Sequence, residues 1–133
     1  MNNRSVREKK MLLVVDDSED MRILLGQILE DQDYDVIYAE DGQDALEQAQ
    51  EHAPDLILMD MSMPGMNGWD AVTQLRQQPA FRRIPIVAIT AHVSKADIER
   101  ALAIGCTAHI GKPFDIMHVL DTVASLLEQP HAV

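Results

Sequence analysis

The sequence contains few of the residues on which several classes of protein depend. It has one cysteine in 133 residues, Cys106, so no internal disulfide can form. Aromatic residues make up only 4% of the chain, so leucine, isoleucine, valine, methionine and alanine must fill the core. No apolar run approaches the roughly 20 residues that a transmembrane helix requires. These absences favour a cytoplasmic protein with one ordinary hydrophobic core.

Basic residues are also scarce: 11 Lys and Arg stand against 22 Asp and Glu, a net charge of −11. This excess of negative charge argues against binding to nucleic acid or to an anionic membrane surface. Residues 1–10 are the exception, because they hold four basic residues and one acidic residue. The apolar run that follows is too short for a signal peptide. We expect a basic arm over 1–10, one folded domain over 11–128 and a short tail over 129–133.

Five short apolar runs alternate with longer amphipathic stretches, which predicts strands alternating with helices. The first, third and fourth runs are almost continuously apolar, as expected of strands buried on both faces. The second is flanked by Asp35 and Glu40, which is typical of an edge strand. This alternation indicates an α/β fold with a parallel sheet covered on both sides. The predicted strands are 11–15, 36–39, 56–59, 86–89 and 107–110.

The segments between these runs carry apolar residues at helical spacing. Clear stripes occur within 18–31, 45–49 and 116–127. Helix starts are indicated where Asp41, Asn67 and Ser94 each stand three residues before an aspartate, as capping residues do. Gly105 follows the stretch 96–104 and is a candidate for its C-cap.

Polar residues of particular kinds follow four of the five predicted strands. Asp16 and Asp17 follow the first strand, Asp60 the third, and Thr90 the fourth, while Lys112 lies two residues beyond the fifth. In open α/β sheets, ligands bind beyond the carboxyl ends of the strands. We therefore expect these side chains to converge at one edge of the sheet.

Each residue type in this set suits phosphoryl chemistry. Three carboxylates together with a backbone carbonyl suit a hard cation such as Mg²⁺. A carboxylate can also attack a phosphoryl group, while a lysine and a hydroxyl hold its other oxygens. As an alternative, Asp16 and Asp17 merely cap a helix over 18–31. That alternative does not account for Asp60, Thr90 and Lys112 at the same edge.

Four motifs in order resemble the receiver domain of two-component response regulators. They are Val14-Val-Asp-Asp17, Leu58-Met-Asp-Met-Ser-Met-Pro-Gly-Met-Asn-Gly68, Ile84-Pro-Ile-Val-Ala-Ile-Thr-Ala91 and Gly111-Lys-Pro-Phe114. Each motif alone is weak, but all four at this spacing over roughly 10–128 are specific. The resemblance implies a stand-alone receiver domain with the flavodoxin-like (βα)5 fold. Its five-stranded, doubly wound parallel sheet would have strand order 2-1-3-4-5.

The resemblance also implies a role for each residue of the cluster. Asp60 would accept a phosphoryl group from a histidine kinase or a histidine phosphotransfer protein. Asp16, Asp17, Asp60 and the backbone carbonyl of Ser62 would bind Mg²⁺. Thr90 would hydrogen-bond the phosphoryl group and move with it, and Lys112 would contact a phosphoryl oxygen. The family further implies a cis bond between Lys112 and Pro113.

The output of such a protein would be a changed surface for a downstream protein. The resemblance places this surface on the helix over 94–104, the strand over 107–110 and the helix over 115–127. It also implies a monomer or a weak, phosphorylation-dependent dimer. The family's switch residue is usually Tyr or Phe, but here the position holds His109. Two interpretations stay open: His109 swings inward as Thr90 moves, or it is a strand-end residue without a switching role.

Three other functions compete with a phosphorylation switch. A phosphohydrolase with an aspartate nucleophile would need Asp-x-Asp after its first strand, where this chain has Asp16-Asp17-Ser18. A flavin carrier would need a phosphate loop at a position that is strongly acidic here, and this acidity would repel a phosphate. A degenerate receiver would act only as a docking module, against which the intact acidic set argues. We therefore expect a switch and not an enzyme.

Overall fold

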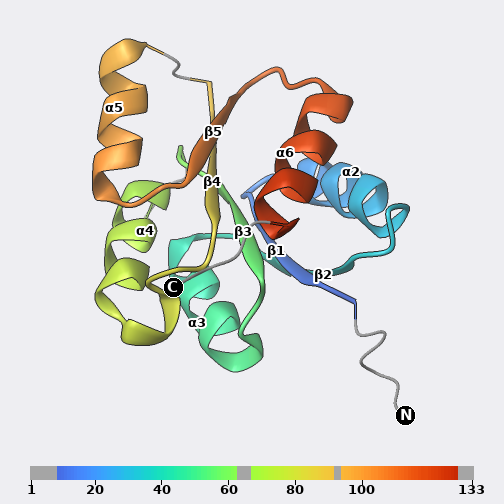
Figure 1. Cartoon of the computed structure of the whole chain (residues 1–133), viewed down its shortest axis with the longest axis horizontal. Coiled ribbons are helices and arrows are strands. Elements are labelled where there is room, and N and C mark those ends of the chain that lie inside the picture. Colours follow the sequence, from blue (N-terminus) through green and yellow to red (C-terminus); the bar gives the residue numbers. More distant parts are fainter. Residues whose placement is uncertain (1–8, 63–66, 92–93, 129–133) are drawn as a thin grey trace.

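Five parallel strands form a single sheet with helices on both faces (Figure 1). The computed structural model describes residues 9–62, 67–91 and 94–128, so most of the predicted basic arm and the whole predicted tail lie outside it. The strand order β2-β1-β3-β4-β5 confirms the predicted topology. The strands are β1 (Met11–Val15), β2 (Asp35–Ala39), β3 (Leu56–Asp60), β4 (Ile86–Thr90) and β5 (Ala108–Gly111).

The helices divide the hydrophobic core into two clusters, one on each face of the sheet. Residues of α2 and α6 pack on one face, and residues of α3, α4 and α5 pack on the other (Figure 1). No helix in the described part of the chain is long and apolar enough to cross a membrane. The helices are α2 (Glu19–Glu30), α3 (Gly42–His52), α4 (Gly68–Gln77), α5 (Lys95–Ile104) and α6 (Ile116–Glu128).

The burial of the strands follows their sequence character. Every residue of β3 and β4 is buried, as their continuous apolar runs predict for central strands. The second strand lies at an edge of the sheet and is only partly covered, which confirms the interpretation based on its flanking acidic residues. Burial of the central strands fixes the sheet, so their carboxyl ends are held in one place.

Local capping chemistry sets the starts of four helices. The side chains of Ser18, Asp41, Asn67 and Ser94 each accept a hydrogen bond from a backbone amide of the first turn. The last three are the caps that the sequence predicts. Gly105 ends α5 in the left-handed region at φ 118°, as expected of a C-cap glycine.

Two local features are absent from the sequence prediction. A short 3-10 helix, η1 (Pro79–Phe81), follows α4 and buries the ring of Phe81. Ala53 ends α3 in the left-handed region at φ 49°, a conformation that is uncommon for a residue with a Cβ. Tertiary packing around these turns outweighs local preference.

Candidate functional site

The carboxyl ends of β1 and β3 bring the predicted acidic residues together. β1 and β3 pair in register, and Asp16 follows the first while Asp60 ends the second. Asp16, Asp17 and Asp60 each offer one carboxylate oxygen within 4.8 Å of the other two. The chain therefore concentrates three like charges at one point of the sheet edge.

Burial differs sharply among these three residues. Asp16 is 2% exposed and Asp60 is 3% exposed, whereas Asp17 is exposed to solvent. Burial of a carboxylate is costly unless hydrogen bonds or a cation compensate it. The cluster is thus a recess with two buried carboxylates and one carboxylate at its mouth.

Backbone amides orient the two buried carboxylates. The amide of Ser18 donates to Oδ1 of Asp16 over 2.9 Å, and the amide of Ser62 donates to Oδ1 of Asp60 over 3.0 Å. The cap of α2 is the hydroxyl of Ser18, which accepts from the amide of Met21. Capping of α2 is therefore not the whole role of the aspartate pair.

Lys112 places a positive charge between the two buried carboxylates. Its Nζ lies 3.6 Å from Oδ2 of Asp16 and 3.5 Å from Oδ2 of Asp60. Its backbone amide donates to the carbonyl of Thr90 over 2.9 Å, so β4 positions the start of this loop. The bond between Lys112 and Pro113 is cis. One ammonium group offsets part of the charge of the three carboxylates.

The pKa of Asp60 is raised above its ordinary value. Burial is the largest cause, and the neighbouring charges of Asp16 and Asp17 add to it. The amide of Ser62 and the ammonium of Lys112 act in the opposite direction. Because the net effect is a raised pKa, the Ser62 amide and Lys112 do not fully offset the burial and like-charge repulsion of the ionised carboxylate.

The donor set fits a magnesium ion. Carboxylate oxygens are the ligands that hard divalent cations prefer, and Mg²⁺ retains waters for the remaining positions. A cation here would relieve the repulsion that raises the pKa of Asp60. The residues present therefore suit Mg²⁺ on both chemical and electrostatic grounds.

Thr90 and His109 lie on the same face of the sheet. Thr90 ends β4 and is 6% exposed, and His109 is a half-buried residue of β5 paired with Ala88. Ala88 belongs to the core cluster under α3, α4 and α5. Because side chains alternate along a strand, Thr90 and His109 share the face covered by α5.

Two residues near the site have no role assigned from the sequence, although Gly68 ends one of the four motifs. Arg22 of α2 donates from a terminal guanidinium nitrogen to the backbone carbonyl of Asp16 over 2.8 Å. Gly68, the first residue of α4, packs directly against the backbone of Asp60 and Met61. A cation in the first turns of a helix, where the helix dipole disfavours it, is the signal that would have identified Arg22.

Comparison with known proteins agrees with this architecture. The family model for the response regulator receiver domain matches residues 12–124. The chain is 36% identical over 118 residues to the polar-differentiation response regulator DivK of Brucella anthropi. The match covers 89% of this chain and 96% of that relative.

Solved structures share the fold over nearly their whole length. The chemotaxis protein CheY4 of Vibrio cholerae is 33% identical, with a TM-score of 0.86 over 90% of this chain and 99% of that one. The receiver domain of the sensor histidine kinase PA1611 of Pseudomonas aeruginosa is 28% identical, with a TM-score of 0.84. That match covers 92% of this chain and 100% of the PA1611 domain, whose structure has a magnesium ion coordinated in its active site cleft.

Proposed function

This chain belongs to the response regulator receiver domain family, and on that premise we propose that it is a phosphorylation switch whose phosphoacceptor is Asp60. The phosphoryl group would come from a histidine kinase or a histidine phosphotransfer protein. The observation that carries the proposal is the placement of Asp60. It is a buried carboxylate within reach of two others, with the ammonium of Lys112 3.5 Å away.

The chemistry is a transfer between two side chains. A carboxylate oxygen of Asp60 forms a bond to phosphorus as the bond from phosphorus to the donor histidine nitrogen breaks, and that nitrogen takes a proton from water, so the imidazole leaves as the neutral ring. Lys112 is placed to hold a phosphoryl oxygen, because it already lies between Asp16 and Asp60. Thr90 would donate its hydroxyl hydrogen to another oxygen.

Asp16, Asp17, Asp60 and the backbone carbonyl of Ser62 would hold Mg²⁺. When bound, the ion supplies positive charge beside the transferred group. The protein's own part is to keep Asp60 ionised and accessible and to orient it through the amide of Ser62. The exposed position of Asp17 supports entry of the ion from solvent.

Signalling would proceed through the face of the sheet that Thr90 and His109 share. Movement of Thr90 toward a phosphoryl group would leave space along the strands, into which the ring of His109 would move. α5 covers this face and buries only Ala101 among its residues, so few contacts hold it in place. We propose that α5, β5 and α6 form the surface that a downstream protein recognises.

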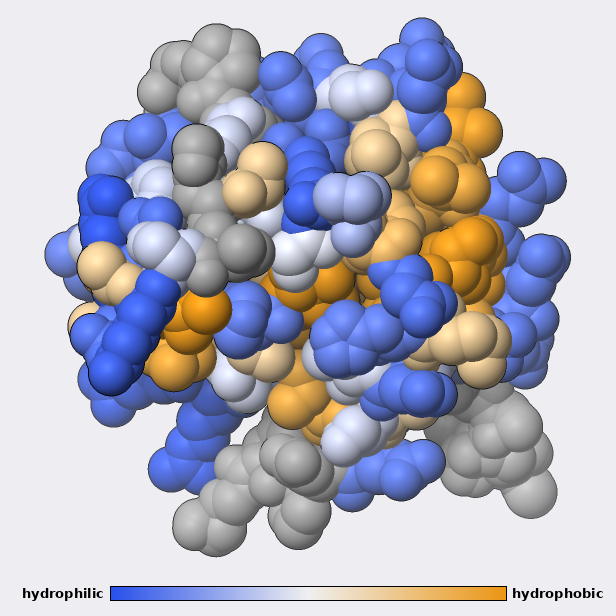
Figure 2. All heavy atoms as spheres, turned by 90° about the horizontal axis from the view of Figure 1, so that it is seen from above, coloured by the Kyte–Doolittle hydropathy of each residue, from blue (hydrophilic) through white to orange (hydrophobic). Residues whose placement is uncertain are grey.

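Donor docking would use apolar residues beside the site. Ile23 and Leu24 of α2 and Ile116 and Met117 of α6 are large apolar residues that are 40–60% exposed. Figure 2 shows apolar side chains gathered on the right of this end of the molecule, where α2 and α6 lie. Exposed apolar patches of this kind mark protein contacts. A histidine kinase or a histidine phosphotransfer protein is the partner that this location favours.

We propose that this chain is a switch and not an enzyme. Its own chemistry would be limited to slow phosphorylation of itself from small donors and loss of that phosphoryl group. It would act in the cytoplasm on protein partners, without nucleic acid or membrane. It would be a monomer or a weak dimer formed on phosphorylation. The domain boundaries proposed are an arm over 1–10, the receiver over 11–128 and a tail over 129–133.

Incubation with acetyl phosphate tests this function. We expect intact mass to show one added phosphoryl group per chain with Mg²⁺ present and almost none with a chelator. The reason is that two other buried or adjacent carboxylates repel an anionic donor until a cation intervenes. Sustained turnover of assorted phosphoesters, without accumulation of a modified protein, would instead favour the aspartate-nucleophile phosphohydrolase.

A further inference from the structure

We propose that Arg22 is a positioning residue of the metal pocket. Its guanidinium would fix the one peptide plane that joins Asp16 to Asp17, and thereby the relative orientation of their carboxylates. This inference rests on the proposed function, because it concerns the Mg²⁺ that the pocket is proposed to bind. Arg22 contributes no ligand atom of its own to this pocket.

The hydrogen bond that carries the inference acts on the backbone. A terminal nitrogen of Arg22 donates to the carbonyl oxygen of Asp16 over 2.8 Å. That oxygen belongs to the planar peptide unit that ends at the amide nitrogen of Asp17. Holding it restricts rotation about the two backbone bonds that flank this plane. These rotations decide how one carboxylate is buried while the next one faces solvent.

The other atoms of Asp16 are already held. Its amide donates to the carbonyl of Ala39 in β2 over 3.1 Å, and its carboxylate accepts from the amide of Ser18. The hydrogen bond from Arg22 holds a further atom, the carbonyl oxygen of Asp16, on the side toward Asp17. Arg22 thus links the orientation of both carboxylates to the position of α2.

Electrostatics alone would disfavour an arginine at this position. The first turns of a helix carry the positive end of its dipole, and a nearby cation site would also be repelled by a guanidinium. The benefit of Arg22 is therefore geometric, and it opposes the charge effect. If Arg22 acts by positioning the peptide, its removal should weaken Mg²⁺ binding. If it acted only through its charge, its removal should strengthen Mg²⁺ binding.

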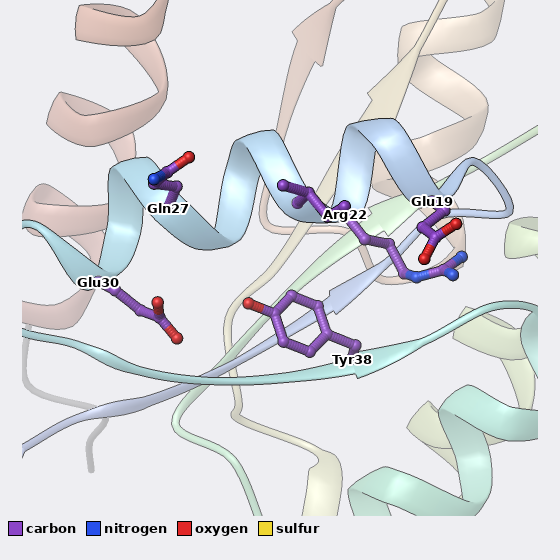
Figure 3. A pocket seen from close by; sticks show the side chains of 6 residues that line it. Glu19, Arg22, Gln27, Glu30 and Tyr38 are labelled. Carbon is purple, nitrogen blue, oxygen red and sulfur yellow. The ribbon is translucent and has the colours of Figure 1, made fainter.

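Arg22 also lines a groove beside the site. Arg22 lines a surface groove of about 400 Å³ together with Glu19, Ile23, Gln27, Glu30 and Tyr38. Figure 3 shows Tyr38 rising from β2 toward α2, and the guanidinium of Arg22 lying beside Glu19. Tyr38 packs so closely on Gly26 that a Cβ there would overlap its hydroxyl. The tight approach of β2 to α2 fixes the helix from which Arg22 reaches Asp16.

Mg²⁺ titration of the full chain tests the role of Arg22. The variants are Arg22→Met, which removes the donors and the charge, and Arg22→Lys, which keeps one donor group and the charge. Arg82→Met is the matched control, because it removes the same charge from an exposed residue outside the site. Binding is followed by calorimetry and by the fluorescence of Trp69, the single tryptophan. Thermal unfolding in chelator checks that each variant is folded.

We expect Arg22→Met to bind Mg²⁺ about 10-fold more weakly than the wild type, the lower end of the range for residues that orient metal ligands. Arg22→Lys and Arg82→Met should stay within about 2-fold. Arg22→Met binding as tightly as Arg82→Met, or more tightly, would overturn the role of Arg22. If Arg22→Met unfolds, Arg22→Gln takes its place under the same criterion. Absence of Mg²⁺ binding by the wild type would instead overturn the proposed function.

Discussion

Asp60→Asn is expected to abolish phosphorylation by acetyl phosphate. An amide is not a nucleophile toward phosphorus, so the acyl phosphate cannot form at this position. The initial rate should fall at least about 100-fold, so almost no modified chain should be seen after an incubation that just modifies the wild type. Asp121→Asn, an identical change at an exposed position of α6, should leave the reaction unchanged. Equal phosphorylation of the two variants would contradict the assignment of Asp60.

The same substitution is expected to raise stability when Mg²⁺ is absent. The raised pKa of Asp60 means that the folded state binds a proton more readily than the unfolded state. Stability therefore falls as pH rises from the ordinary carboxyl pKa through the raised one, and the ionised group is destabilising at pH 7. Asp60→Asn should therefore increase the free energy of unfolding and raise Tm at pH 7.

Thermal melts in chelator at a series of pH values check this effect. The advantage of Asp60→Asn over the wild type should be full at pH 7 and should shrink as pH falls through the raised pKa of Asp60, where the wild-type carboxyl becomes neutral. Asp121→Asn should show no such dependence on pH. A lower Tm for Asp60→Asn at pH 7 would show that Lys112 compensates the buried carboxylate fully.

Gly68→Ala is expected to give the largest loss of stability. A Cβ on Gly68 would lie 2.7 Å from Cα of Met61 and closer still to the carbonyl oxygen of Asp60. Both contacts involve backbone, which cannot move aside without displacing the end of β3 or the start of α4. Overpacking of this kind costs about 1–3 kcal/mol, and it should also slow phosphorylation because Asp60 itself is displaced.

Urea unfolding measures this cost, and helix propensity supplies a contrary expectation. Alanine is favoured over glycine in a helix by about 1 kcal/mol, so propensity alone predicts that Gly68→Ala stabilises the protein. Gln74→Ala, at an exposed position of the same helix, should change stability by less than about 0.5 kcal/mol. A stabilised Gly68→Ala variant would show that α4 can move away from β3 without strain.

The strand order and most helix boundaries follow from the sequence because local signals agree with the fold. Continuous apolar runs mark the buried strands β3 and β4, and caps such as Asn67 and Ser94 mark helix starts. η1 and the left-handed Ala53 do not follow from such signals. Their conformations depend on what packs around them, such as the buried ring of Phe81, and not on residue preference.

The sequence predicts those features of the site that follow from where the strands end. Parallel pairing brings Asp16 and Asp60 together whatever their side chains do, so the cluster is visible in the sequence. The unequal burial of Asp16 and Asp17 is not visible in the sequence, because it depends on the orientation of the peptide plane between them. The contact from Arg22 is also hidden, since it depends on how α2 is rotated over the sheet.

The central claim is tested most directly by locating the phosphoryl group within the chain. The protein would be treated with acetyl phosphate, with Mg²⁺ or with a chelator, then reduced with borohydride, digested and sequenced by mass spectrometry. Reduction converts an aspartyl phosphate to a stable alcohol at the modified residue. We predict this alcohol at residue 60, in the Mg²⁺ sample. Modification at Asp16 or Asp17, or equal modification of Asp60 in chelator, would contradict the account.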